Sequence, residues 1–397
     1  MRVGILTREF PPEVYGGAGV HVEYLARELA RTVEVAVHCF GEPRQSALVA
    51  GAYQPWEALA GPEPSSAALE AMSVDLAMAA RLGGVDVVHS HTWYANLAGH
   101  LAKLLWNVPH VCTTHSLEPL RPWKAEQLGG GYALSSFCER TALEHADAVI
   151  AVSAQMRADV IACYPAVDPA RVAVIHNGVD VEEYAPDRGV AVVDRLGIDA
   201  NRPSVVFVGR ITRQKGIVHL LEAAEHIDPA AQLVLIAGAP DTPEIGAEVR
   251  TVLARARHRD GGLLWIEEML DRREVIQVLS HATVFVCPSV YEPFGLVNLE
   301  AMACETAVVA SAVGGIPEIV VDAETGYLVP CDVSAERPDP EAARRFAEAL
   351  AERINALVTQ PALARAFGEA GRRRVVEHFS WSSVAERTVA LYTGLLA

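Results

Sequence analysis

The sequence predicts an α/β protein of two doubly wound halves, because short apolar segments alternate with helical patterns along the chain. Strands are expected at 2–7, 33–39, 86–90, 110–114 and 148–152, and again near 204–208, 232–237, 263–266, 284–287, 307–310 and 326–329. Between these two series, residues 180–203 are polar and lack strong periodicity, which indicates a boundary. We therefore expect an N-terminal domain at 1–182 and a C-terminal domain at 183–379, and 397 residues suffice for two cores.

Composition narrows the function classes without selecting one. The net charge of −17 disfavours nonspecific binding to nucleic acid or to anionic membranes, so a local basic cluster must hold any anionic substrate. The seven cysteines form no CxxC pair, which is typical of free thiols in a reducing cytoplasm. The chain starts with a strand and has no apolar run of about 18 residues, so we expect no signal peptide and no membrane span. Residues 41–66, rich in Gly, Pro and Ser, are expected to be irregular.

Two strand-to-helix connections carry groups that suit phosphates. After the first strand, Gly16 and Gly17 open a helix, so that backbone N–H groups there can face a phosphate. After the strand at 204–208, Arg210 and Lys215 share one connection. Because Arg offers a planar fork and Lys a compact point charge, the pair suits a diphosphate, and the following helix adds its N-terminal dipole.

The segment 288-PSVYEPFGLVNLEAM-302 places two carboxylates eight residues apart. Glu292 is expected on the loop at a strand's carboxyl end, and Glu300 on the helix that follows. Open α/β sheets bind ligands in that crevice, where two carboxylates can accept hydrogen bonds from a sugar or a ribose. The alternative is one exposed loop carboxylate and one solvated helix carboxylate. Downstream, a Gly-Gly turn precedes Pro317, which suits a first helical turn.

These motifs together resemble the retaining GT-B glycosyltransferases over nearly the full length of the chain. The resemblance rests on the glycine-rich first loop, Arg210 with Lys215, the Glu292/Glu300 pair and 176-HNGVD-180. Within that superfamily, residues 113–153 are similar to the short glycogen synthases of actinobacterial type, a group that includes alpha-maltose-1-phosphate synthases. The resemblance implies the GT-B fold, with two Rossmann-like domains facing an interdomain cleft, and a C-terminal helix at 380–397 that packs back on the first domain.

The resemblance also implies site residues. The set implied for catalysis is His115, Arg210, Lys215 and Glu292, and the set implied for donor binding is Gly16, Gly17, Arg210, Lys215, Glu292, Phe294, Gly295, Leu296 and Glu300. By itself His115 would be interpreted as a capping or core histidine. The implied reaction is glucosyl transfer from ADP-glucose with retention, to glucose 1-phosphate or to an α-glucan end. The departing phosphate takes the acceptor proton on the same face, unless Glu292 forms a covalent intermediate.

For the acceptor, basic and aromatic residues of the first domain are the candidates, and they are Arg8, His91, Trp93, Arg121 and Lys124. A phosphorylated acceptor needs such a cluster, although surface charges without a role are the slightly favoured interpretation of Arg121 and Lys124. His91 and Trp93 equally suit the end of a strand. No metal or other cofactor is expected, because His89 and His91 lack partners at ligand spacing. A homodimer is left open.

Other function classes fit less well. The fingerprint of a dinucleotide-binding oxidoreductase has a third glycine where 17-GAGVHV-22 has Val22. The sequence contains no P-loop motif, which excludes a P-loop nucleotidase. A sugar-nucleotide 2-epimerase would share the fold and need no acceptor, and a noncatalytic glucan-binding protein would not need the basic and acidic residues together. Transferases that use other nucleotide sugars with inositol phosphate, sugar or lipid acceptors remain alternatives.

Overall fold

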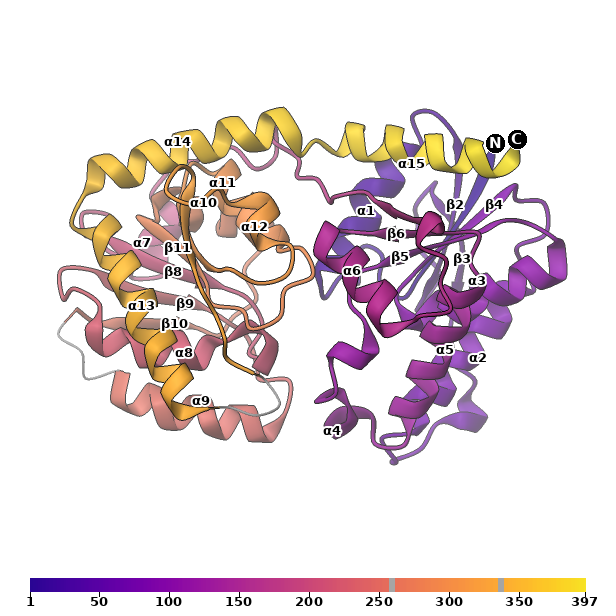
Figure 1. The fold of residues 1–397 in the computed structure, drawn as a ribbon, viewed down its shortest axis with the longest axis horizontal. Helices are drawn as coiled ribbons and strands as arrows, with labels where there is room; N and C mark the ends of the chain where they lie inside the picture. The colour runs from indigo at the N-terminus through magenta and orange to yellow at the C-terminus, as the bar shows by residue number, and fades with distance from the viewer. Residues whose placement is uncertain (257–260, 335–338) are drawn as a thin grey trace. The chain divides into compact units, whose positions relative to one another are not determined.

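The structure, a computed structural model, describes residues 1–256, 261–334 and 339–397. The chain forms two compact units: unit 1 consists of Met1–Gly178 and Trp381–Ala397, and unit 2 of Val179–Ser380. Each unit has a parallel sheet with helices packed against it (Figure 1). The predicted fold class, α/β with two doubly wound Rossmann-like domains, is confirmed.

The sheet of unit 1 has seven parallel strands in the order β3-β2-β1-β4-β5-β6-β7. The strands are β1 Arg2–Thr7, β2 Glu34–Phe40, β3 Val49–Tyr53, β4 Val87–His91, β5 His110–Thr114, β6 Ala148–Ala151 and β7 Val172–Val174. The α-helices are α1 Gly17–Leu29, α2 Ser66–Ala79, α3 Trp93–Trp106, α4 Lys124–Leu128, α5 Gly131–His145, α6 Ala154–Cys163 and α15 Trp381–Leu396.

The prediction that residues 41–66 are irregular was wrong in part, because β3 lies within them. The strand reads VAGAY, and its glycine and alanines carry little strand propensity. It pairs only with β2, at one edge of the sheet, so no residue in it needs to be strongly apolar. The three-residue β7 at the other edge was not predicted either, because it is too short to show a period.

The sheet of unit 2 has six parallel strands in the order β10-β9-β8-β11-β12-β13, at the six predicted positions. They are β8 Ser204–Val208, β9 Gln232–Ile236, β10 Leu263–Ile266, β11 Val284–Cys287, β12 Ala307–Ser311 and β13 Gly326–Val329. The α-helices are α7 Ala191–Arg195, α8 Ile217–Ala223, α9 Pro243–Ala256, α10 Arg272–His281, α11 Leu296–Ala303, α12 Ile316–Ile319, α13 Pro340–Val358 and α14 Pro361–His378.

Each sheet has a switch point at which the strand order reverses. In unit 1 this point lies between β1 and β4, and in unit 2 between β8 and β11. Loops that leave the carboxyl ends of two such strands run to opposite faces, which opens a crevice for a ligand. The predicted phosphate loops follow β1 and β8, while Glu292 follows β11. The sequence motifs therefore converge on the switch points.

The last helix, α15, completes the core of unit 1 and lies beside α1 (Figure 1). Trp381 stacks on Tyr24 of α1, with ring centroids 5.6 Å apart. Near the other end of α15, the buried Tyr392 hydroxyl lies 2.6 Å from Nδ1 of His89 on β4. In the part of the chain that the structure describes, no helix is long and apolar enough to cross a membrane.

Asp75 of α2 is a buried carboxyl group, 1% exposed, on a helix that packs against α3 and α5. Its oxygens have no well-formed hydrogen bond within the described residues. Burial raises the pKa of Asp75 well above its usual range, and a contact with the backbone at Ala98 lowers it only in part. The folded protein therefore keeps a proton that the unfolded chain loses above about pH 4.

Asp75 is expected to make the free energy of unfolding fall as pH rises, because the unfolded state then binds fewer protons than the folded state. Asp75→Asn removes this dependence. The free energy of unfolding of the variant relative to the parent is expected to rise with pH above about 4, by at most about 1.4 kcal/mol per unit. Urea unfolding between pH 5 and 8 measures the slope. Glu63→Gln, an exposed carboxylate just before the same helix, is the control, and an equal slope in both variants would contradict the assignment.

Candidate active site

The loop after β8 in unit 2 is held by local capping and by the neighbouring loop. The side chain of Thr212 accepts a hydrogen bond from the backbone N–H of Lys215 and caps a 3₁₀ turn over Arg213–Lys215. Gly216 then has φ +62, and a Cβ on it would lie 2.0 Å from the carbonyl oxygen of Pro288. The loops after β8 and β11 thus pack backbone against backbone, which only glycine allows here.

That packing brings Lys215 to Glu292. The ammonium of Lys215 lies 2.6 Å from Oε2 of Glu292, and the Ser289 hydroxyl donates to the same oxygen at 3.0 Å. Burial lowers the pKa of Lys215, but the charge of Glu292 and further contributions outweigh it, so the pKa lies above its usual range. Lys215 therefore stays charged at neutral pH. A third loop joins them, because the Gly315 N–H donates to the carbonyl of Glu292 at 3.0 Å.

Two further predicted residues have partners that the sequence did not indicate. Arg210 lies 3.2 Å from a carboxylate oxygen of Asp241, which follows β9. Glu300 accepts a hydrogen bond from the Tyr184 hydroxyl at 3.0 Å. Burial raises the pKa of Glu300, which the Tyr184 bond partly offsets. The position of Asp241 after a strand was a usable signal, whereas Tyr184 lies in a segment without periodicity.

The remaining donor candidates in unit 2 surround the start of α11. Gly295 has φ +105 and precedes the helix, where Leu296 is the first residue. Phe294 is buried, with its ring 6.3 Å from that of Phe379. The side chain of Phe294 thus belongs to the core, and only its backbone is left to meet a ligand.

In unit 1, the glycine-rich loop already holds a carboxylate. Glu9 accepts hydrogen bonds from the N–H groups of Tyr15 and Gly16, both at 2.8 Å. A phosphate on the Gly16 amide must therefore displace Glu9, whereas Gly17 begins α1 and is exposed. Glu9 was not among the residues predicted from the sequence. Its only signal was an acidic residue a few positions before a helix start.

The strand ends of unit 1 bring the predicted histidines together. Nδ1 of His91, the last residue of β4, lies 3.1 Å from Nε2 of His115, which follows β5. Burial, and then neighbouring histidines, hold the pKa values of both rings well below the usual range, so both are neutral at pH 7. Trp93 begins α3, is buried, and lies 4.0 Å from the ring of Tyr94. The Arg8 guanidinium lies 4.2 Å from the centroid of the Tyr94 ring.

The two basic acceptor candidates after β5 differ in their surroundings. Lys124 is 5% exposed, and its ammonium lies 2.8 Å from Oε1 of Glu118, which is also buried. Arg121 is half-buried and donates to the Ser116 hydroxyl at 3.0 Å. Its buried Nε has no partner within the described residues. Arg121 is therefore better disposed than Lys124 to bind an additional anion.

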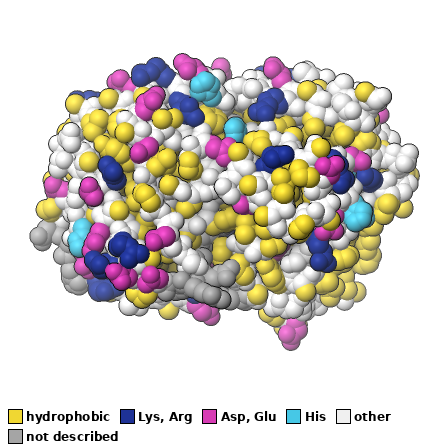
Figure 2. Space-filling model, in the orientation of Figure 1, with side chains coloured by type: hydrophobic (Ala, Val, Ile, Leu, Met, Phe, Trp, Pro, Cys, Tyr) yellow, Lys and Arg dark blue, Asp and Glu magenta, His cyan; other side chains and the backbone are white. Residues whose placement is uncertain are grey.

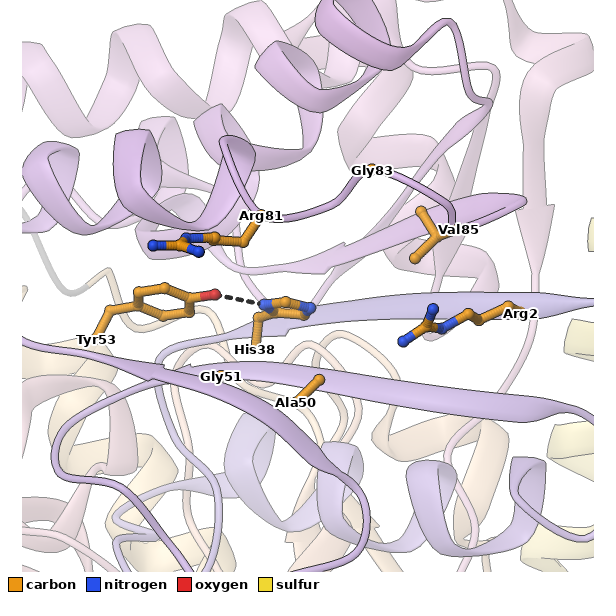
Figure 3. Close-up of a pocket in the computed structure, with 8 residues that line it drawn as sticks. All are labelled: Arg2, His38, Ala50, Gly51, Tyr53, Arg81, Gly83 and Val85. Carbon is orange, nitrogen blue, oxygen red and sulfur yellow. Dashed lines mark hydrogen bonds between the residues drawn. The ribbon is translucent and has the colours of Figure 1, made fainter.

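A surface pocket of about 390 Å³ in unit 1 contains none of the predicted site residues (Figure 3). It includes Arg2 at the beginning of β1, and Arg8 follows the opposite end of that strand. Burial lowers the pKa of His38 in this pocket to about 4, and its Nδ1 lies 2.7 Å from the Tyr53 hydroxyl. Over the face drawn in Figure 2, basic and acidic side chains are interspersed. An anionic substrate must therefore rely on local groups.

Comparison with known proteins agrees with this geometry. The family model described as Glycosyltransferase Family 4 matches residues 15–183, and the model described as Glycosyl transferases group 1 matches residues 192–374. An alpha-maltose-1-phosphate synthase of Mycolicibacterium smegmatis is 56% identical, with 99% of each chain covered. The protein of that name from Mycobacterium tuberculosis H37Rv is 53% identical, with 100% of each covered. Among solved structures, sucrose-phosphate synthase from Thermosynechococcus elongatus has a TM-score of 0.81 and 28% identity, covering 99% of this chain and 98% of that one.

Proposed function

Because this chain belongs to the GT-B glycosyltransferases, we propose that it transfers α-glucose from ADP-glucose to the 4-hydroxyl of glucose 1-phosphate, with retention, giving maltose 1-phosphate. The observation that carries the proposal is the joining of the loops after β8, β11 and β12 through Lys215, Glu292 and Gly315. Transfer to an α-glucan end is the second candidate, because the same donor site would serve it. Neither reaction requires a metal in this proposal.

Unit 2 is proposed to hold the donor. Arg210 and Lys215 grip the diphosphate and stabilise the negative charge that develops on the leaving nucleotide. Lys215 suits this role because its pairing with Glu292 keeps it charged, so no proton has to move when the phosphate arrives. Glu300 accepts the ribose hydroxyls, with Tyr184 fixing its carboxylate. Backbone groups at Gly295 and Leu296 complete the donor site.

The environment of Glu292 favours the front-face route over a covalent one. A nucleophilic carboxylate needs a lone pair directed at the anomeric carbon. Here Oε2 of Glu292 is engaged by both the Lys215 ammonium and the Ser289 hydroxyl. These bonds lower its nucleophilicity, so the leaving phosphate is the better base for the acceptor hydroxyl. Glu292 then serves as a hydrogen-bond acceptor for the donor sugar.

Unit 1 is proposed to bind the acceptor. The neutral His115 can accept or donate a hydrogen bond to a sugar hydroxyl without placing a positive charge beside an oxocarbenium-like centre. Arg8 and Arg121 are the basic side chains proposed for the acceptor phosphate, and Arg121 brings a buried N–H in need of a partner. This assignment predicts a preference for phosphorylated over neutral acceptors.

A product assay tests the function. Purified protein receives ADP-glucose with either glucose 1-phosphate or glycogen, and proton NMR of the product reads the anomeric configuration. We expect ADP release and a phosphorylated α-1,4 disaccharide from the first mixture. A β-linked product, or turnover with UDP-glucose and a different acceptor alone, would contradict the proposal. Elongation of glycogen without turnover of glucose 1-phosphate would select the second candidate.

A further inference from the structure

Three histidines from three separate elements of unit 1 converge on one point. They are His21 on α1, His91 at the end of β4 and His115 after β5, and one ring nitrogen from each lies within 4.8 Å of the other two. Their ring centroids are 4.7 to 5.4 Å apart. No local spacing in the sequence predicts this cluster, because 70 residues separate the first from the second and 24 the second from the third.

Two ring nitrogens in the cluster lack partners. Nε2 of His21 and Nε2 of His91 are buried without a hydrogen bond to any described residue. A buried polar atom without a partner has lost its hydrogen bonds to water and has gained none in the protein, which destabilises the fold. Nδ1 of His21 lies 2.8 Å from the side-chain oxygen of Asn177, so it carries the proton and donates. The lone pair of His21 is therefore on Nε2, within the cluster.

We propose that His21, His91 and His115 bind one divalent transition-metal ion of the Zn²⁺ class, with a fourth position open to water or a sugar hydroxyl. Imidazole nitrogens suit Zn²⁺, Ni²⁺ and Cu²⁺, whereas Mg²⁺ and Ca²⁺ prefer oxygen ligands. Two nitrogens at 2.0–2.1 Å from a tetrahedral Zn²⁺ lie about 3.4 Å apart. The 3.1 Å between Nδ1 of His91 and Nε2 of His115 needs little change to meet that spacing.

The surroundings of the cluster support a metal. The ring of His21 is buried, with only 2% of the residue exposed, so its ligand atom lies inside the protein. Asn177 fixes the tautomer and the orientation of that ring, as outer partners of metal-binding histidines do. With Nδ1 of His91 and Nε2 of His115 as ligands, the proton that they share shifts to the other nitrogen of its own ring, so metal binding releases none. The orphaned atom that the ion satisfies is Nε2 of His21.

The consequence for activity rests on the proposed function. Because His115 is there assigned to a sugar hydroxyl, and His91 is an acceptor candidate from the sequence, the bound ion would occupy lone pairs that the substrates need. The metal would therefore inhibit transfer, and chelation would reverse it. The ion is thus a regulator of this site and takes no part in the transfer itself.

Metal binding is measured directly on the full-length protein without an affinity tag. Isothermal titration with Zn²⁺ is expected to show one saturable equivalent, and Co²⁺ should give the intense visible absorption of a four-coordinate site. His21→Gln and His91→Gln should abolish both signals. Asn177→Ala, which removes only the orienting partner, should weaken binding by roughly 10–100-fold. Thermal melts of each variant establish that it folds.

His145→Gln is the matched control, because His145 is an exposed histidine of the same unit whose ring lies 5.2 Å from His100. It should leave the Zn²⁺ signal unchanged. Retention of the Zn²⁺ signal in folded His21→Gln, or no saturable equivalent at all, overturns the proposal. The readout does not depend on turnover: a protein that binds Zn²⁺ through these histidines and transfers no glucose would contradict the proposed function alone.

Discussion

Replacing Arg210 with alanine is expected to lower kcat with ADP-glucose by roughly 10²–10³-fold, because one preorganised donor to the leaving diphosphate is lost. Lys215→Ala should have an effect of similar size. Steady-state kinetics of both variants, with glucose 1-phosphate as acceptor, measures it. The loss should appear mainly in kcat, since the charge on the departing phosphate grows in the transition state.

Arg213→Ala is the control for this prediction. Arg213 lies on the same turn as Lys215 and is paired with Glu248 at 3.3 Å. It should keep the parent's kcat. Lys215→Ala also removes the ion pair of Glu292, so the melting temperature of this variant must be compared with that of the parent. Unchanged turnover in folded Arg210→Ala and Lys215→Ala would overturn the donor-site assignment.

Lys124→Met is expected to destabilise the protein by roughly 3–5 kcal/mol, because it leaves the buried Glu118 carboxylate without a cation. Glu118 also accepts from the Ser135 hydroxyl at 2.6 Å, which cannot replace a charge. Urea unfolding at pH 7 measures the loss. A residue that served only the acceptor phosphate would instead raise KM for glucose 1-phosphate and leave the unfolding midpoint unchanged.

The double variant Lys124→Met with Glu118→Gln separates the ion pair from the loss of packing. It should recover most of the stability, since neither charge is then buried alone. Arg140→Met is the control, because Arg140 is an exposed basic residue on the neighbouring helix α5. Equal stability of Lys124→Met and Arg140→Met would show that Lys124 has no structural role and return it to the acceptor candidates.

The sequence predicted most of the fold because each core strand carries its own signal. All six strands of unit 2 lie where apolar, β-branched runs indicated, while β3 and β7 were missed because edge strands need little apolar character. The placement of Glu292 on a loop and Glu300 on a helix followed from the same periodicity. These features are local, so neighbouring residues suffice to specify them.

The sequence by itself determined the two doubly wound units and the loops that carry Arg210, Lys215 and Glu292, because the carboxyl ends of parallel strands share one edge of a sheet. Only the tertiary structure decided which side chains pair. In the structure Lys124 pairs with Glu118, and His21 lies beside His91. Tyr392 forms a hydrogen bond with His89, 303 positions away in the chain. Such contacts depend on how the elements pack, and burial then fixes which groups are charged, which no local pattern encodes.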